Sequence, residues 1–282
     1  MSISANTLLT ASALAIACAL LSLFVVLCRW AFIGEGIGHS GFGGAGTAWI
    51  LALLFPALDQ PWIPYACVIV FCLLTACAIA MITRKGEVNS DAAIGIFMVA
   101  SLAWGFLAQQ IYIQVRHTSP SLFSDLLFGQ IASFSPDHAR AVIIVCLGVI
   151  LVVILLWKQF IAYSFDPMLA ASSGVPARFI HYLLILLLAM VIVVSMRLAG
   201  SVLVTALLVL PAATALRISQ RLDVVLTISI ATAFAGAICG VLLNHRWPFL
   251  PPGPMIVLLM FVEFLVAWVI GAFQQASWEG RG

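Results

Sequence analysis

The sequence consists mainly of apolar runs of about 20 residues, the length at which a helix crosses the ~30 Å hydrocarbon core of a bilayer. No water is available inside lipid, so such a run must satisfy its own backbone N–H and C=O groups by forming a helix. Hydrophobic residues make up 64% of the chain and charged residues 8%, and the mean hydropathy is +1.21. Soluble domains carry about 25% charged residues. We therefore expect an all-α polytopic membrane protein.

The apolar runs predict a single transmembrane domain over residues 1–282, with about eight to nine spans. Residues 1–10 contain no Lys or Arg, so they lack the basic start of a signal peptide, and the first run is interpreted as a retained span. The seventh run opens at Gly200 and is interrupted at Pro211, a pattern typical of a broken helix that lines a cavity. The predicted spans cover residues 8–28, 31–57, 64–82, 92–115, 139–157, 179–196, 200–216, 223–243 and 254–273.

The basic residues favour an orientation with the amino terminus outside. Eight of the 12 Lys and Arg residues then lie on the cytoplasmic side, in agreement with the positive-inside rule. These eight are Arg29, Arg84, Lys85, Lys158, Arg178, Arg217, Arg221 and Arg281.

Several classes of function are disfavoured by composition and by the motifs that the sequence lacks. It contains no GxxxxGK[ST], HExxH or GxSxG motif, so we expect neither nucleotide hydrolysis nor a hydrolase site. A net charge of +2 provides no basic surface for nucleic acid. The seven cysteines form no CxxC pair and are expected to be small buried apolar side chains. If the chain moves a substrate uphill, the energy must come from another chain.

Two connections between spans are longer than a turn requires. In the outer one, the apolar patch Leu122–Ile131 is too short to cross the membrane and predicts a short helix at the outer surface. In the inner one, Asp166 can cap a helix that has Pro167 at its first position, and Gly174 can end it. Residues 166–175 are therefore predicted to form a short cytoplasmic helix. On these residues alone, an ordinary interfacial helix and a docking element are equally consistent interpretations.

Glu35 and His39 form an ionisable pair within an apolar segment. Four residues apart on a helix, the two side chains lie one above the other. Counting ~1.5 Å per residue from Trp30 at the cytoplasmic end places His39 ~14 Å deep, close to the bilayer midplane. Such a pair is costly unless it faces a wet cavity or a partner, so it either binds a ligand or satisfies a helix contact. The glycines around it fit close helix packing and a thin-walled path equally well; they are Gly34, Gly36, Gly38, Gly41, Gly43, Gly44 and Gly46.

Five segments, spread in order over residues 10–270, carry a family resemblance. They are GEGIGHSGFGG (34–44), SDAAIGI (90–96), LLFGQI (126–131), SFDPMLAASSGV (164–175) and GSVLVTALLVLPAATA (200–215). Each segment is a weak signal, but the ordered set resembles the integral membrane permeases of ATP-binding-cassette (ABC) importers for zinc, manganese and iron.

This resemblance implies a type II ABC importer-like permease in a bacterial plasma (inner) membrane, which is not itself an enzyme. It also implies a second permease copy or related chain, two copies of a cytoplasmic ATPase, and an extracytoplasmic solute-binding protein that delivers the ion. Glu35 and His39 then match metal positions for a Zn, Mn or Fe ion in transit, with no permanently bound cofactor. The coupling helix that docks in the ATPase would use Asp166, Pro167, Ala170, Gly174 and Val175. Further path or structural positions would be Gly41, Gly44, Pro211 and Glu263.

Some residues depart from the family pattern. Glu35 replaces an aspartate and keeps the ligand chemistry on a longer arm, whereas Gly43 replaces a proline and removes a kink. Met168 replaces the glutamate of the coupling helix and loses a charge that could pair with the ATPase. Glu263, within the last span, is also atypical. It could belong to the path, pair with a basic group, or stay protonated in the interior.

Three other functions remain open from the sequence. A permease for iron-siderophore or cobalamin would share the coupling helix but would not need a chelating Glu–His pair. An ion-gradient-driven secondary transporter could use Glu263 as a proton site, although the halves of the chain show no obvious repeat. An intramembrane enzyme would need a third metal ligand or a nucleophile, and none lies at motif spacing.

Overall fold

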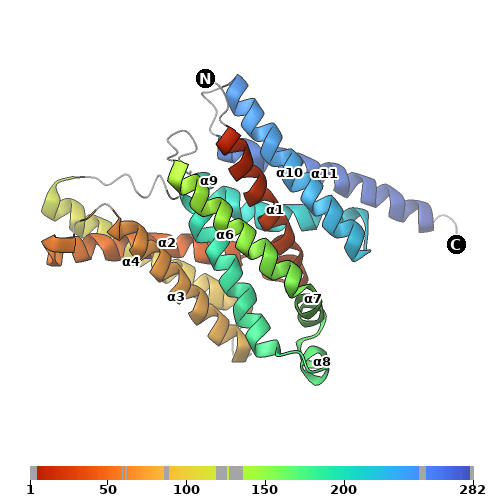
Figure 1. Ribbon diagram of the computed structural model, residues 1–282, viewed down its shortest axis with the longest axis horizontal. Coiled ribbons are helices and arrows are strands. Elements are labelled where there is room, and N and C mark those ends of the chain that lie inside the picture. Colours follow the sequence, from red (N-terminus) through yellow and green to blue (C-terminus); the bar gives the residue numbers. More distant parts are fainter. Residues whose placement is uncertain are drawn as a thin grey trace.

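The computed structural model describes residues 5–58, 60, 62–85, 89–118, 126, 136–247 and 252–279. These residues form an all-helical bundle without strands (Figure 1). Its helices are α1 (Ala5–Leu27), α2 (Ile33–Leu54), the short 3-10 helix η1 (Pro56–Leu58), α3 (Ile63–Lys85), α4 (Ser90–Arg116), α6 (Pro136–Leu155), α7 (Trp157–Phe165), α8 (Pro167–Ser172), α9 (Ala177–Ile218), α10 (Leu222–Arg246) and α11 (Pro252–Glu279).

Within the described residues, eight helical segments are long and apolar enough to cross a membrane, which agrees with the predicted number of spans. The predicted spans 179–196 and 200–216 are the two halves of α9, whose backbone is non-helical at Gly200 (φ 76°, ψ 157°). The expected break in this segment is therefore confirmed. The helix predicted at Leu122–Ile131 lies outside the described residues, apart from Leu126.

Helix α2 is the exception to the hydropathy pattern. Its 22 residues rise ~33 Å, enough to cross the hydrocarbon core. It is not among the eight apolar segments, because its many glycines and the Glu35–His39 pair lower its hydropathy. Most of its residues are buried. It packs mainly against α3, α4 and α9, and Figure 1 shows α2, α3 and α4 together on one side of the bundle.

Glycines allow the neighbours of α2 to approach its backbone. A Cβ added at Gly44 would lie 2.6 Å from the Cα of Val68 on α3. A Cβ at Gly46 would lie 2.9 Å from the Cα of Gly105 on α4. These distances are shorter than a van der Waals contact, so only glycine fits there. Close approach through small residues is the usual way in which membrane helices associate.

Helix ends that the basic residues predict to be cytoplasmic contact one another in two pairs. The end of α11 contacts the end of α9, because a Cβ at Gly271 would lie 2.7 Å from the carbonyl oxygen of Arg217. The start of α9 is bonded to the end of α3, through a 3.0 Å hydrogen bond from His181 to the carbonyl of Ala80. Helices α7 and α8 lie at the end of the bundle away from the start of α1 (Figure 1).

We expect Gly44→Ala to destabilise the bundle, because the added Cβ would meet the backbone of α3 rather than a flexible side chain. The matched control is Gly148→Ala in α6, where a Cβ has no atom within 4 Å. Alanine is the better helix former by ~1 kcal/mol, so the control should be at least as stable as the parent. Thermal unfolding of both variants in one detergent measures the difference. Equal midpoints for Gly44→Ala and the parent would contradict this packing role.

Candidate functional site

Glu35 and His39 lie one above the other near the start of α2, as their spacing predicts. His39 Nε2 and Glu35 Oε1 are 3.2 Å apart, so the ring N–H donates to the carboxylate. The other ring nitrogen, Nδ1, is buried and has no hydrogen-bond partner among the described residues. An unsatisfied buried polar atom costs about 1–3 kcal/mol. The ring of His39 is therefore paired at Nε2 alone among the described residues.

Exposure decreases along the face of α2 that carries the pair. Phe32 is 60% exposed, the side chains of Glu35 and His39 are 41% and 17% exposed, and Phe42 is 1% exposed. The ring of Phe42 packs edge-on against His39, with centroids 5.7 Å apart. In this chain the pair is therefore accessible from the predicted cytoplasmic end of α2, and the face is closed beyond His39.

The separation of the two polar atoms suits a shared cation. Nitrogen and oxygen ligands bind first-row divalent ions at about 2.0–2.2 Å, which puts neighbouring ligands about 2.8–3.6 Å apart at octahedral or tetrahedral angles. The observed 3.2 Å falls within this range. Among the described residues, no group of three His, Cys, Asp or Glu side chains could hold a metal ion. The pair therefore offers two of the ligands that an ion needs.

The break in α9 lies beside this pair. Gly38, which precedes His39, faces the break, since a Cβ there would lie 3.2 Å from the Cβ of Ser201. The hydroxyls of Ser195 and Ser201, on either side of the break, are buried without a hydrogen-bond partner among the described residues. Sequence reasoning missed both serines, although their positions flanking Gly200 were an available signal. Interrupted membrane helices bind ions through such freed polar groups.

Pro211 lies within the second half of α9. Proline disrupts the preceding helical turn. The backbone N–H of the next residue, Ala212, donates to the buried hydroxyl of Ser22 on α1 at 3.0 Å. Pro211 thus lies at a contact between α1 and α9.

The remaining positions considered for the path differ in their surroundings. A Cβ at Gly41 would lie 2.7 Å from the terminal methyl of Met196, a flexible group, whereas Gly44 faces backbone. Glu263 lies half-buried on α11, and its Oε2 has no hydrogen-bond partner among the described residues. Helix α11 packs chiefly on α9 and α10, not on α2. Glu263 therefore lies on a helix that packs against other helices than those around the Glu35–His39 pair, apart from α9.

The helix start and end predicted within residues 166–175 are both confirmed in α8. The carboxylate of Asp166 accepts hydrogen bonds from the backbone N–H groups of Met168 and Leu169, at 2.8 and 3.0 Å. Gly174 follows the helix with φ 85°, a conformation that favours glycine. The N–H of Val175 bonds to the carbonyl of Ala170 at 3.0 Å, which completes a Schellman cap.

One residue of the predicted docking surface was assigned wrongly. Ala170 is 2% exposed because it packs against its own chain, so it cannot seat in a partner. Val175 is partly buried, whereas Asp166, Pro167 and Gly174 are exposed. The exposed apolar side chains here are Phe165, Met168 and Leu169, at 63%, 85% and 65%.

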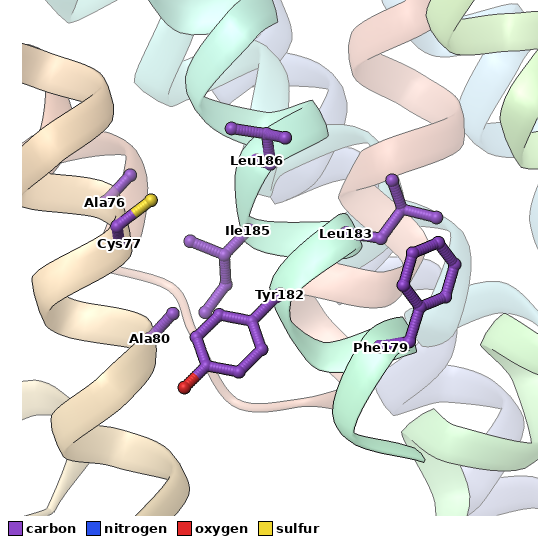
Figure 2. A pocket seen from close by; sticks show the side chains of 8 residues that line it. All are labelled: Ala76, Cys77, Ala80, Phe179, Tyr182, Leu183, Ile185 and Leu186. Carbon is purple, nitrogen blue, oxygen red and sulfur yellow. The ribbon is translucent and has the colours of Figure 1, made fainter. Parts of the chain in front are cut away.

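A groove of about 150 Å³ between α3 and α9 has a mainly apolar lining that does not suit a cation (Figure 2). No carboxylate or imidazole lines it. The lining residues are Ala76, Cys77, Ala80, Phe179, Tyr182, Leu183, Ile185 and Leu186.

Comparison with known families and curated proteins finds similarity over nearly the whole chain. The ABC 3 transport family matches residues 1–271. A manganese import system permease protein of Streptococcus parasanguinis is 33% identical over 272 residues, 96% of this chain and 92% of that protein. A probable iron transport system membrane protein of Haemophilus influenzae is 30% identical, over 93% of this chain and 91% of that one.

Solved structures share the fold. PsaBC from Streptococcus pneumoniae, determined in complex with a Fab, matches with a TM-score of 0.75 and 31% identity, over 93% of this chain and 90% of that one. An inward-facing metal-chelate type ABC transporter matches with a TM-score of 0.67 and 15% identity, over 93% and 84% of the two chains. At that identity the second match shows the fold alone.

Proposed function

The chain belongs to the ABC 3 transport family, and from this premise we propose that it is the permease subunit of an ATP-driven importer of divalent manganese or iron. It is a multi-pass protein of a bacterial plasma membrane, and its family makes it a transport subunit rather than an enzyme. The sequence interpretation allows zinc, manganese and iron. The printed names of the relatives, which are manganese and iron proteins, support the last two metals.

The observation that carries the choice of cargo is the geometry of Glu35 and His39. A carboxylate oxygen and an imidazole nitrogen 3.2 Å apart can bind one borderline divalent ion. Two ligands hold an ion weakly, which allows it to enter and to leave. We propose that a second permease chain, related by a two-fold axis along the path, supplies the other ligands when the path is closed. Opening the path would then lower the affinity and release the ion.

The main alternative, uptake of an iron-siderophore or cobalamin, is less consistent with this site. Such a cargo carries its metal already chelated, so it has no need of a carboxylate and an imidazole in the path. The neighbour described as a metal-chelate transporter shares the fold at 15% identity and gives no support for its cargo here.

We predict that Glu35→Ala and His39→Ala each abolish uptake of manganese and iron, because each removes one of the two ligands. Glu35→Asp should retain much of the activity, since it keeps the carboxylate. The measurement is uptake of radiolabelled manganese, with competing metals, by vesicles that contain this chain, an ATPase and a solute-binding protein.

Asp223→Ala is the matched control for these alanine variants. Asp223 is an exposed acidic residue in the first turn of α10 that pairs with the exposed Arg221, so its loss should leave uptake unchanged. Assembly with the ATPase and ATP hydrolysis should persist in all four variants. Wild-type uptake by either ligand variant would refute the site.

We propose that α8 is the coupling helix that docks in the ATPase. Its cap and its Schellman ending make a rigid short element at the predicted cytoplasmic end, and such an element can transmit a rigid-body movement. Its exposed apolar side chains are Phe165, Met168 and Leu169, and the carboxylate of Asp166 is engaged in capping. The partner surface should therefore be apolar opposite Met168, which is 85% exposed.

We predict that Gly174→Val uncouples ATP hydrolysis from uptake while the protein stays inserted and folded. No atom lies within 4 Å of a Cβ at this position, so the effect comes from φ 85° and not from a clash. A left-handed conformation costs a residue with a Cβ about 1–2 kcal/mol, so the ending of α8 should change. Asparagine tolerates this conformation, and Gly174→Asn should therefore remain more tightly coupled. The ratio of metal imported to ATP hydrolysed is the readout, and normal coupling in Gly174→Val would remove the assignment.

Glu263→Gln should be tolerated for metal uptake, because Glu263 lies on α11 and away from the α2 pair. The substitution keeps the size of the side chain and removes its charge. The same vesicle assay measures the effect. A loss of more than about tenfold, ~1.4 kcal/mol in barrier terms, would place Glu263 in the transport cycle and favour a proton-coupled mechanism.

A further inference from the structure

His181, in the first turns of α9, is buried at a junction of three elements. It is 5% exposed, and its Nε2 lies 3.0 Å from the carbonyl oxygen of Ala80 on α3. Its Nδ1 lies 2.6 Å from the hydroxyl of Tyr163 on α7. A carbonyl oxygen can only accept, so the hydrogen of the neutral ring is on Nε2, and Nδ1 accepts from the Tyr163 O–H. One side chain therefore ties α7, α9 and α3 together.

The turn that leads into α2 packs on the same junction. The ring of Trp30 meets His181 edge-on, with centroids 5.4 Å apart. A second contact joins the same turn to α7, where the thiol of Cys28 donates to the hydroxyl of Ser164 at 3.5 Å. Figure 2 shows α3 and α9 side by side at this level, with Tyr182, the neighbour of His181, beside Ala80.

The turn is a rigid connection into α2. The N–H of Trp30 bonds to the carbonyl of Val25 at 2.8 Å, and the N–H of Arg29 bonds to the carbonyl of Val26 at 3.1 Å. These are the two bonds of a Schellman motif, with Arg29 in the left-handed conformation at φ 58°. The N–H of Ile33, the first residue of α2, bonds to the carbonyl of Trp30 at 2.9 Å. A movement of Trp30 must therefore move the start of α2, which carries Glu35.

The junction around His181 also lies next to α8. Tyr163 lies in the last turn of α7, and Asp166 both ends α7 and caps α8. No flexible loop separates the two helices, so a displacement of α8 is transmitted to the end of α7. Rigid elements and buried hydrogen bonds are the physical means by which such a displacement reaches another site.

We propose that the Tyr163–His181 hydrogen bond is a positioning contact that transmits movement of α8 to the start of α2, and so to the Glu35–His39 pair. This proposal rests on the function proposed above, because it concerns the coupling of ATP hydrolysis to the ion site. Neither residue touches the ion. Both act by holding the α1–α2 turn in a fixed relation to the coupling helix.

The first test is Tyr163→Phe, which removes one hydroxyl and keeps the ring. The matched control is Tyr182→Phe, the same chemical change at the neighbour of His181, on the side that faces the apolar groove (Figure 2). Each variant is assembled with the ATPase and the solute-binding protein in vesicles. We expect Tyr163→Phe to lower the metal imported per ATP hydrolysed by roughly two- to thirtyfold, the range of coupling effects at such positions. Tyr182→Phe should leave the ratio unchanged.

A pair of substitutions at His181 separates its bond with Tyr163 from its contacts with α3. The α3 contacts are both at Nε2, with the carbonyl of Ala80 at 3.0 Å and the hydroxyl of Thr83 at 3.4 Å. His181→Gln places an amide N–H near the position of Nε2, so it keeps the contact with Ala80 and loses the acceptor for Tyr163. His181→Asn places its amide oxygen near Nδ1, so it keeps the acceptor for Tyr163 and loses the donor to Ala80. The proposal requires the coupling ratio of His181→Gln to fall with that of Tyr163→Phe, and the ratio of His181→Asn to stay closer to the parent.

A second measurement does not depend on transport. Hydrogen exchange of the backbone N–H groups of residues 28–33 should be faster in Tyr163→Phe than in Tyr182→Phe. The reason is that His181, on which Trp30 packs, is then no longer held by the Tyr163 hydroxyl. If exchange is faster in Tyr163→Phe but the parent protein imports no metal, the proposed function is refuted and the positioning contact is still supported. Unchanged exchange together with an unchanged coupling ratio would overturn the contact. An equal fall in uptake and ATP hydrolysis would also overturn it, since that result indicates lost assembly.

Discussion

Close approach between α2 and its neighbours is the constraint on which the rest of this structure depends. Lipid is as apolar as the helix surfaces, so burial of apolar side chains does not drive helices together in a membrane, and contact must come from close packing. At Gly44 and Gly46 the backbones of α3 and α4 occupy the space in which a side chain would lie. This packing holds most of α2 in the interior and positions Glu35 and His39, whose side chains are 41% and 17% exposed.

Three of the polar contacts described above follow one another from α8 toward the interior. The cap of α8 is at the predicted cytoplasmic end, the buried Tyr163–His181 contact follows, and the Glu35–His39 pair lies further along α2. The break in α9 at Gly200 adjoins this pair, because Gly38 packs on Ser201. Buried polar groups are costly in a membrane unless they are paired or functional, so their concentration along this route is informative.

Much of this arrangement could be predicted from local sequence signals. Apolar length predicted the spans, Gly200 predicted the break in α9, and Asp166, Pro167 and Gly174 predicted the limits of α8, because each signal acts within a few residues. The inward orientation of Ala170 could not be predicted, since it depends on how α8 lies against its own chain. The contact of Tyr163 with His181 and the unpartnered hydroxyls of Ser195 and Ser201 depend on tertiary packing and leave no periodic pattern. Contacts between chains that would complete the proposed ion site likewise leave no local sequence pattern.

The contact between Gly46 and Gly105 has a consequence for how this protein can change over evolutionary time. In most buried contacts a larger residue on one side can be compensated by a smaller residue on the other. Here both residues are already glycine, and a Cβ at either one would meet the backbone of the opposite helix. No second substitution can restore the fit, so α2 and α4 can diverge at this crossing only by moving apart. Such a movement would also carry His39, two helical turns away, out of register with the break in α9.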